Sequence, residues 1–209
     1  PKTFEEETFY KEEVEMSTEQ SFRCAAVTIK QSKSPAWNPE RKKRATSTKA
    51  LKLIRAYENQ VDYKTLISHF EGKSFKSEAT DHENKYEETA KKKFILVTGW
   101  QVFDIGLVCK DKFSWFGGSP DGLVHCKLSD DFGLLEIKCP FKCKDDKEID
   151  IKKLTFFLNK EVKLKDSSPY YSQIQLNCWV TGAKFAHLFL WIPSGDYKLI
   201  LVPVKPSFA

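Results

Sequence analysis

Three charged side chains stand in segments that otherwise have the composition of buried strands. Asp121 follows a Ser-Pro turn in "GGSPDGLV", and Glu136 and Lys138 lie among apolar residues in "GLLEIKCPF". An isolated carboxylate in an apolar strand is strongly disfavoured unless a partner compensates its charge. Two carboxylates and a lysine at one end of a sheet would form a site for a hard divalent cation, with magnesium or manganese favoured over zinc. The lysine would position a water or stabilise charge on a phosphate.

The elements that must bring these side chains together are two strands joined by the polar stretch "KLSDDFG". In a hairpin, Asp121 at the start of the first strand lies near Glu136 and Lys138 at the end of the second. Residues two apart in a strand project from the same face, so Glu136 and Lys138 are expected side by side. The alternative is an ordinary Pro-Asp-Gly turn and a structural ion pair between Glu136 and Lys138. The hairpin that links the two motifs favours the metal site.

The order of the predicted elements indicates one α/β domain. Residues 1–36 have the character of an N-terminal arm, and residues 37–209 that of a single domain. From Phe94 onward the chain is β-rich, aromatic and punctuated by glycine, as in "FILVTGWQVFDIGLVC" and "FSWFGG". A lysine-rich stretch from Lys142 to Lys165 follows, and the apolar strands "AHLFLWIP" and "KLILVPV" come last. We therefore predict an α/β (α+β) fold with a central mixed β-sheet flanked by helices.

Helices are predicted before and within this β-rich region. "RATSTKALKLIRAY" has helical periodicity, with Thr46 or Ser47 available as its cap and Tyr57 on its apolar face. A shorter helix is predicted in "DYKTLISHF", and a third in "ATDHENKYEETAKKKF", which is acidic at its start and basic at its end. We expect "SPYYSQIQLNCWVTG" to form a helix with Pro169 near its start and Gly182 past its end.

The composition limits the classes of function open to the chain. A net charge of +5 and a pI of about 8.8 permit an anionic partner such as nucleic acid. No apolar run approaches the roughly 18 residues of a membrane helix, and a start at Pro1 leads us to expect a fragment of a longer protein. Scattered cysteines indicate free thiols in an intracellular compartment, nuclear or cytoplasmic. Zinc at Cys139 and Cys143 is the less favoured alternative, because no second pair of ligands accompanies them.

The stretches "SPDGLV" and "LLEIKCPF" together resemble the PD-(D/E)xK nuclease signature. Three more stretches resemble elements of the lambda-exonuclease or YqaJ-type viral recombinase family within that superfamily. "QSKSPAWNPERKKRATST" is similar to its N-terminal tryptophan and arginine element, "DHENKYEETA" to its glutamate-bearing helix, and "YYSQIQLNCWVTG" to its glutamine-bearing helix. The five stretches occur in the family's order, and the resemblance extends from about Gln31 to Pro193, which is most of the chain.

This resemblance implies roles for individual residues. The side chains implied as catalytic are Glu83, Asp121, Glu136, Lys138 and Gln173. The implied ligands of a catalytic Mg²⁺, for which Mn²⁺ could substitute, are Asp121, Glu136, the main-chain carbonyl of Ile137, and Glu83. Lys138 would position and activate the attacking water, and Gln173 would lie beside the water and the phosphate. Asp111 occupies a position where some relatives carry an acid.

The resemblance also implies a double-stranded DNA partner. The residues implied in binding its 5′-phosphate and backbone are Arg41, Arg44, Thr48, Ser119 and Gln173. Where the family has "ITAS" this chain has "ATST", in which Thr48 keeps the hydroxyl. The implied activity is that of a 5′→3′ exonuclease on DNA ends, with a role in recombination. An endonuclease or structure-selective nuclease of the same fold and a catalytically silent DNA-binding module are the alternatives. Relatives form rings around DNA, and a homo-oligomer stays open for this chain.

Overall fold

A computed structural model describes most of the chain. The described residues are 3–61, 77–110, 112–126 and 131–204. Two predictions lie outside them: the helix in "DYKTLISHF" and the acid at Asp111. Within them, two β-sheets with flanking helices confirm the predicted α/β (α+β) class with a central mixed sheet. The division into an arm of residues 1–36 and a domain of residues 37–209 stays a prediction.

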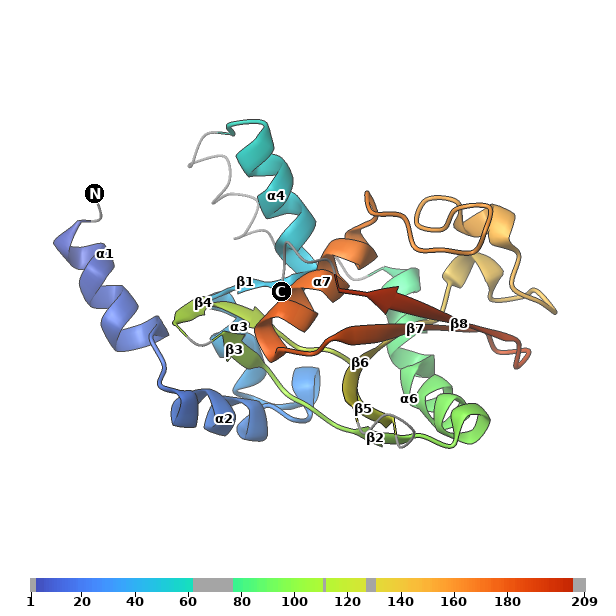
Figure 1. Cartoon of the computed structure of the whole chain (residues 1–209), viewed down its shortest axis with the longest axis horizontal. Helices are drawn as coiled ribbons and strands as arrows, with labels where there is room; N and C mark the ends of the chain where they lie inside the picture. Colours follow the sequence, from blue (N-terminus) through green and yellow to red (C-terminus); the bar gives the residue numbers. More distant parts are fainter. Residues whose placement is uncertain (1–2, 62–76, 111, 127–130, 205–209) are drawn as a thin grey trace.

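A five-stranded sheet runs through the centre of the protein in the order β2-β5-β6-β7-β8 (Figure 1). Its strands are β2 (Gln101–Phe103), β5 (Gly122–Cys126), β6 (Asp131–Lys138), β7 (Phe185–Trp191) and β8 (Tyr197–Pro203). The β6–β7 pair is parallel and the other pairs are antiparallel, so the sheet is mixed. β5 and β6 form the predicted hairpin, and β6 is the central strand, as its apolar composition indicated.

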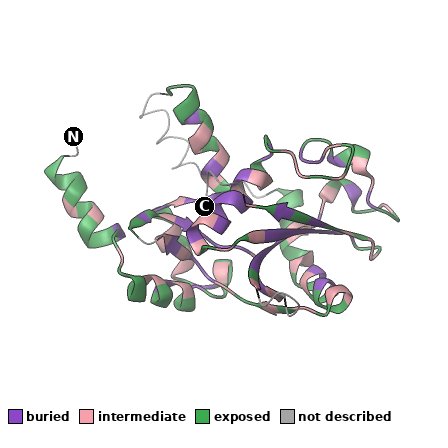
Figure 2. Ribbon diagram, viewed as in Figure 1, coloured by how far each residue is buried: buried purple, intermediate pink, exposed green. Residues whose placement is uncertain are grey.

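Two helices pack against opposite faces of this sheet. They are α6 (Glu78–Thr98) and α7 (Pro169–Thr181). Side chains of β6 alternate between them: Leu135 clusters with Phe94 of α6, and Leu134 clusters with Ile174 of α7. The central strands are consequently buried on both faces (Figure 2). This alternation places Glu136 and Lys138 on the face of β6 that α7 covers.

The sequence at the helix ends explains where both helices begin and stop. Ser77 and Ser168 precede α6 and α7, and each side chain accepts a hydrogen bond from a main-chain N–H of the first turn. Gly99 and Gly182 follow the last helical residues with φ of 68° and 77°, a left-handed conformation that glycine adopts without strain. The predicted start and end of α7 are confirmed.

α6 continues through a segment that we predicted to be a strand. The residues from Phe94 to Thr98 form its last turns, and β structure begins only with β2. Phe94 is fully buried, with its ring 5.4 Å from that of Phe189 and 6.1 Å from that of Trp100. A short apolar run suits a buried helix as well as a buried strand, so composition alone led to the wrong assignment.

A smaller sheet lies beside the first, with the strand order β1-β4-β3. Its strands are β1 (Ala45–Thr46), β3 (Val108–Lys110) and β4 (Phe113–Gly118), and the neighbouring helices are α3 (Trp37–Lys42) and α4 (Ala50–Glu58). The predicted capping of α4 by Thr46 or Ser47 is wrong, because Thr46 pairs in β1 and Ser47 starts a 3-10 turn. Tyr57 is 88% exposed, and it is Ala50 and Ala56 that face the interior.

The N-terminal segment folds against the smaller sheet. Its elements are α1 (Phe4–Phe9), a π-helical turn (Tyr10–Val14), α2 (Thr18–Val27) and a 3-10 turn (Gln31–Lys33). The Ser21 hydroxyl of α2 donates to the Cys109 carbonyl of β3 at 2.9 Å, and Cys24 packs with Leu107 and Cys109. None of the helices in the described ranges is both long and apolar enough to cross a bilayer.

The segment between β6 and α7 consists of loops and short turns. Two 3-10 turns, Phe141–Cys143 and Ile151–Leu154, and an isolated bridge between Leu158 and Leu164 are its regular elements in the described chain. Leu154, Phe157 and Leu158 are almost fully buried in the core that α7 covers. The segment is thereby held beside the end of β6 that carries Lys138.

Candidate active site

Asp121 lies at the open end of the β5–β6 hairpin, opposite Glu136. Gly122 pairs with Leu135, and the Asp121 N–H donates to the Leu135 carbonyl at 3.1 Å. The Asp121 Oδ2 atom accepts a hydrogen bond of 2.6 Å from the Ile137 N–H. A Cβ atom at Gly122 would lie 2.6 Å from a methyl carbon of β2, so glycine lets β2 pair closely here. The carbonyl of Ile137 as a metal ligand stays a prediction.

Glu136 is the most deeply buried carboxylate of the site, with only 2% of its surface exposed. Its Oε1 atom accepts hydrogen bonds from Lys138 Nζ at 2.9 Å and from Gln173 Nε2 at 2.5 Å. Its Oε2 atom has no hydrogen-bond partner among the residues that the structure describes. A buried carboxylate oxygen without a partner is costly, and one that faces a polar cluster is suited to a cation.

Lys138 joins the hairpin to α6. Its Nζ atom lies 2.9 Å from Glu83 Oε1 and 2.9 Å from Glu136 Oε1, and its side chain is 13% exposed. α7 contributes Gln173, which bonds the same Glu136 oxygen as Lys138. The structure thus brings the five side chains predicted as catalytic to one end of the central sheet. We call the carboxylates Glu83, Glu87, Asp121 and Glu136, with Lys138 among them, the acid cluster.

The acid cluster contains more negative charge than one ammonium can compensate. Burial and the neighbouring Asp121 raise the pKa of Glu136 to about 8, although Lys138 acts to lower it. Burial also raises the pKa of Asp121. Burial alone would lower the pKa of Lys138, but Glu136, Glu83 and Asp121 outweigh it and hold that pKa well above its ordinary value. Lys138 is therefore a permanent cation here, and additional positive charge would stabilise the cluster.

The donor atoms of the acid cluster fit a hard divalent cation in kind. Carboxylate oxygens are the ligands that magnesium and manganese prefer, and Glu136 supplies a buried oxygen without a partner in the described chain. The Lys138 ammonium lies between Glu83 and Glu136, and no three His, Cys, Asp or Glu side chains of the described ranges already surround one point suitable for an ion. Lys138 occupies Oε1 of Glu136, so Oε2 is the Glu136 oxygen that remains available to a cation.

Two members of the site were missed by the sequence analysis. Burial and Asp121 raise the pKa of Glu87 to about 7, which places its carboxylate beside the predicted acids. Its spacing of four residues from Glu83 on one helix face could have indicated this position. Tyr170 of α7 is the other: the Lys138 Nζ atom lies 5.1 Å from its ring centre, within cation–π range. No sequence signal indicated Tyr170, because its position depends on how α7 packs on the sheet.

A second polar group adjoins the acid cluster through the short stretch that carries Ser119 and Asp121. The Arg41 guanidinium stacks 4.2 Å from the Trp37 ring centre and donates to Thr48 Oγ1 at 3.1 Å. Trp37 Nε1 donates to Ser119 Oγ at 3.2 Å. The residues predicted to bind a 5′-phosphate, Arg41, Thr48 and Ser119, thus belong to one group with Trp37, which we call the Arg41 cluster. Their phosphate-binding role stays a prediction.

The Arg41 cluster has an excess of positive charge. Burial lowers the pKa of Arg41 to about 10. Burial, Arg41 and Lys52 together lower the pKa of Lys49, which follows Thr48 in the chain. An anion bound beside Arg41 and Lys49 would stabilise the charged form of both side chains. The electrostatics of the Arg41 cluster are thus the reverse of those of the acid cluster.

Arg44 does not belong to the Arg41 cluster, and the prediction that it contacts DNA is wrong. Its side chain has no exposed surface. It donates to the Ser114 and Val14 carbonyls at 2.8 and 3.0 Å, and to the Glu40 carbonyl and carboxylate at 2.9 and 2.7 Å. These bonds hold the N-terminal segment, α3 and β4 together. Arg44 is a structural residue, because its donors point into the interior.

The cysteines do not form the alternative zinc site. Five cysteines are free, as predicted: Cys24, Cys109, Cys139, Cys143 and Cys178. No group of three potential zinc ligands occurs in the described parts of the chain. Burial raises the pKa of Cys139 to about 12, so its thiol stays protonated. Cys139 is buried in the core between the central sheet and α6.

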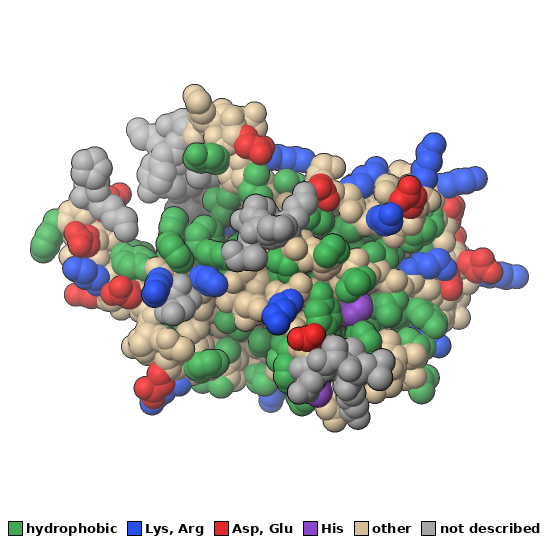
Figure 3. Space-filling model, in the orientation of Figure 1, with side chains coloured by type: hydrophobic (Ala, Val, Ile, Leu, Met, Phe, Trp, Pro, Cys, Tyr) green, Lys and Arg blue, Asp and Glu red, His purple; other side chains and the backbone are tan. Residues whose placement is uncertain are grey.

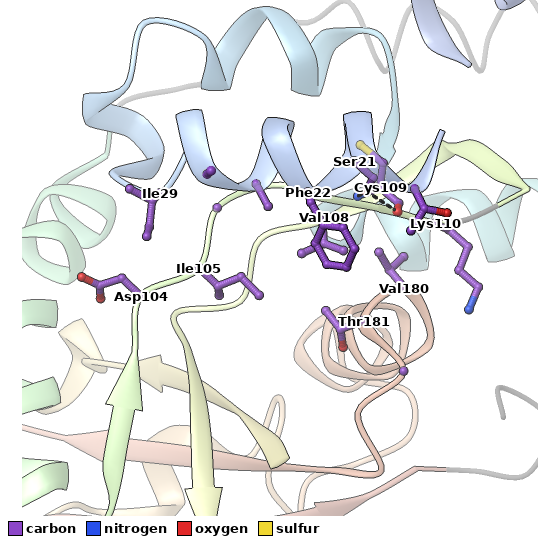
Figure 4. A pocket seen from close by; sticks show the side chains of 15 residues that line it. Ser21, Phe22, Ile29, Asp104, Ile105, Val108, Cys109, Lys110, Val180 and Thr181 are labelled. Carbon is purple, nitrogen blue, oxygen red and sulfur yellow. Dashed lines mark hydrogen bonds between the residues drawn. The ribbon is translucent and has the colours of Figure 1, made fainter. Parts of the chain in front are cut away.

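One hollow lies away from both clusters. It has a volume of about 460 Å³ and is bounded by α2, by the stretch from Asp104 to Lys110 and by the end of α7 (Figure 4). Its wall is mostly apolar, with Phe22, Ile29 and Val180 among the contributing side chains. No carboxylate of the acid cluster lines it, so the described chemistry does not take place there.

No curated protein matches the sequence. An alkaline exonuclease (LHK-Exo) from Laribacter hongkongensis is 23% identical with a TM-score of 0.57, and the alignment covers 79% of each chain. The SOX protein in a SOX–DNA complex is 14% identical with a TM-score of 0.54, over 95% of this chain and 73% of that one. KSHV SOX in an RNA complex is 13% identical with a TM-score of 0.55, over 95% and 76%.

The chain shares the fold of these solved structures, and at these identities they establish the fold alone. The family follows from the sequence model for the YqaJ-like viral recombinase domain, which matches residues 36–184. This match covers more than half of the chain. The protein therefore belongs to the YqaJ-like viral recombinase domain family, as the resemblance predicted.

Proposed function

We propose that the protein is a divalent-metal-dependent DNA nuclease, and specifically a 5′→3′ exonuclease acting on double-stranded ends. The observation that carries this proposal is the convergence of Glu83, Asp121, Glu136, Lys138 and Gln173 at one end of the β5–β6 hairpin. Membership of the YqaJ-like family supports it. So do the solved structures of the same fold, which are those of an alkaline exonuclease and of a SOX–DNA complex.

The residues that would hold the metal are Asp121, Glu136 and Glu83, with the Ile137 carbonyl. When bound there, Mg²⁺ or Mn²⁺ would neutralise charge on the scissile phosphate and lower the pKa of an attacking water. Lys138, which bridges Glu83 and Glu136, would donate a hydrogen bond to the water or to a phosphate oxygen. Gln173, already bonded to Glu136 at 2.5 Å, would hold that carboxylate in one orientation. In the metal-free chain, the neighbouring carboxylates hold the pKa of Lys138 well above its ordinary value, so Lys138 is the cation of the cluster.

The Arg41 cluster supports a preference for DNA ends. A terminal 5′-phosphate carries more charge than an internal phosphodiester, and a guanidinium with neighbouring hydroxyls can bind its extra oxygen. Ser119 of this cluster is two residues from Asp121, so a phosphate held there would place the adjoining nucleotide near the acid cluster. The net charge of +5 would assist binding to the duplex without reading its sequence.

The proposal is tested with two substrates incubated with the purified full chain and Mg²⁺. One is an end-labelled linear duplex with 5′-phosphates, and the other is a covalently closed circle. We expect the labelled strand to be degraded progressively from its 5′ end and the circle to remain intact. Cleavage of the circle would show an endonuclease instead. DNA binding without hydrolysis in either substrate would show a catalytically silent module.

Variants connect this activity to the site. Glu136→Ala and Lys138→Ala should each abolish hydrolysis, because each removes a member of the acid cluster. Glu88→Gln changes an exposed carboxylate of α6, the helix that carries Glu83, and should leave the rate unchanged. Wild-type activity in the Glu136 or Lys138 variant would rule out the acid cluster as the active site.

A further inference from the structure

A small pocket lies beside the acid cluster, and one of its walls is aromatic. Its volume is about 230 Å³, below the roughly 300–1,000 Å³ usual for sites that hold drug-sized ligands. Glu83 and Lys138 of the acid cluster line it. Its aromatic residues, from the β6–α7 segment and the start of α7, are Phe141, Phe156, Phe157 and Tyr170. We call this the aromatic pocket.

The rings of this wall pack on one another, and one of them is half-exposed. Phe157 is 1% exposed, and its ring centre lies 4.7 Å from that of Phe156 and 5.0 Å from that of Tyr170. Phe156, in contrast, is 52% exposed. A half-exposed ring that rests on a buried ring is fixed in position and presents an apolar surface to a planar ligand.

Two lysine side chains lie over rings of the aromatic pocket. Lys142 Nζ lies 5.2 Å from the Phe156 ring centre, and Lys138 Nζ lies 5.1 Å from that of Tyr170. Glu83 is the only acid among the described lining residues, and it is paired with Lys138. Lysine side chains gather at the right-hand end of the protein in Figure 3, over the region where Figure 1 shows the β6–α7 segment. Aromatic faces beside cations suit a ligand with a flat ring and an anionic group.

We propose that the aromatic pocket receives a nucleobase next to the scissile phosphate. The base would stack on Phe156 beside Lys142, and the scissile phosphate would lie at the acid cluster. The inference rests on the proposed function, since a base reaches the pocket when its phosphate lies at the acid cluster. Stacking uses a surface that every base has, so the pocket holds bases without reading sequence. A base enters only after it has left the stack of the duplex, and the pocket therefore selects an unpaired nucleotide at a strand end.

The test measures stacking directly and does not depend on turnover. A 5′-phosphorylated oligonucleotide with 2-aminopurine near its 5′ end is titrated with the full chain while a chelator removes divalent metal, so that the strand stays intact. We expect saturable quenching of the 2-aminopurine fluorescence. Phe156→Ala should weaken the quenched complex about tenfold, and Phe156→Trp should retain the quenching.

Phe132→Ala is the matched control, because Phe132 is 49% exposed on β6 and does not line the aromatic pocket. It should behave as the wild type. Thermal unfolding checks that each variant is folded. No quenching by the wild-type chain, or equal quenching by a folded Phe156→Ala variant, overturns the proposal. The rate of hydrolysis of end-labelled duplex is measured separately. An inactive wild-type chain counts against the nuclease proposal, whereas unchanged quenching by Phe156→Ala counts against the base pocket.

A competition experiment identifies the source of the base. Free dAMP is added to the quenched complex of the wild type and of Phe156→Trp. Recovery of fluorescence shows that a released mononucleotide occupies the same pocket as the strand. Persistent quenching shows that the pocket holds the base of the intact strand, where neighbouring phosphates contribute to binding. Both results support a nucleobase site.

Discussion

The acid cluster and the Arg41 cluster hold charge in opposite ways. In the acid cluster, Glu136 is 2% exposed and several carboxylates share the ammonium of Lys138. In the Arg41 cluster, Arg41 stacks on Trp37, and the charges that act on Lys49 are those of other cations. One cluster is stabilised by an added cation and the other by an added anion. A metal ion would supply the cation for the acid cluster, and a terminal phosphate would supply the anion for the Arg41 cluster.

The two clusters are also built differently. The acid cluster depends on strand register, because the pairing of β5 with β6 fixes Asp121 opposite Glu136. The Arg41 cluster depends on side-chain contacts between α3 and the stretch before Asp121, through Trp37 and Ser119. Changes in the first should therefore affect chemistry, whereas changes in the second should affect which end of DNA is chosen.

The strongest way to separate the clusters is Glu136→Gln, which preserves size but removes the charge. We expect the rate of DNA hydrolysis to fall about 1,000-fold or more, the upper range for loss of one electrostatic group in an active site. Binding of a 5′-phosphorylated duplex should be kept, because the Arg41 cluster is intact. Single-turnover hydrolysis and fluorescence anisotropy measure the two properties. A parallel loss of both would remove the distinction between the clusters.

A contrast between Arg44 and its exposed neighbour Lys42 tests the boundary of the Arg41 cluster. Arg44→Ala should lower the free energy of unfolding by about 3 kcal/mol, because it leaves Glu40 and two buried carbonyls without their donor. Lys42→Ala, an exposed neighbour, should change it by less than about 0.5 kcal/mol. Urea unfolding measures both. If Arg44→Ala instead left stability unchanged and weakened DNA binding, the structural role given to Arg44 would be wrong.

The acid cluster should also make stability depend on pH in the absence of metal. The folded chain keeps the Glu136 proton up to a pKa of about 8, whereas an unfolded glutamate loses it near pH 4.3. Between these values the folded state binds more protons, so the free energy of unfolding falls as pH rises. Glu136→Gln should therefore gain roughly 2 kcal/mol over the wild type, or about 4–8 °C, between pH 5 and pH 8.

Thermal unfolding of both chains across this pH range, with a chelator present, measures the gain. Glu88→Gln is the control, because its carboxylate is exposed and its difference from the wild type should stay constant. A Glu136→Gln difference that is equally constant would mean that Glu136 titrates at an ordinary pKa.

The smallest effect is expected at the Arg41 cluster. Arg41→Lys keeps the charge but loses the planar fork and the stacking on Trp37. The preference for 5′-phosphorylated over 5′-hydroxyl ends should fall about tenfold, with little change in the rate at saturating DNA. Initial rates on the two substrates measure this preference, with Lys42→Ala as control. An unaltered preference would remove Arg41 from the phosphate site.

The sequence predicted the acid cluster well where local rules apply. The alternation of β6 and the hairpin placed Asp121, Glu136 and Lys138 together, because strand period and turn position are local properties. Gln173 and Glu83 came from the family resemblance, since nothing local says that α6 and α7 meet at the end of β6. Local spacing indicates which residues share a face of one element, and it does not indicate what that face contacts.

Three errors show where sequence reasoning reached its limit. Arg44 stands in "RKKR", and no local signal separates a buried arginine from its exposed neighbours. "FILVT" suits a strand by composition, and the packing of Phe94 against Phe189 keeps it helical. Thr46 has the chemistry of a helix cap, and pairing of β1 with β4 takes it into a sheet instead. In each case a tertiary contact decided between two local options.

The most direct test of the central claim is calorimetric titration of the metal-free chain with Mg²⁺ and with Mn²⁺ at pH 7, in two buffers of different ionisation enthalpy. A cation at the acid cluster favours the charged carboxylates, so binding should release protons and the apparent enthalpy should differ between buffers. Glu136→Gln should lose most of the binding and most of the proton release, while Glu88→Gln should retain both. Equal metal binding by the wild type and Glu136→Gln would contradict the account.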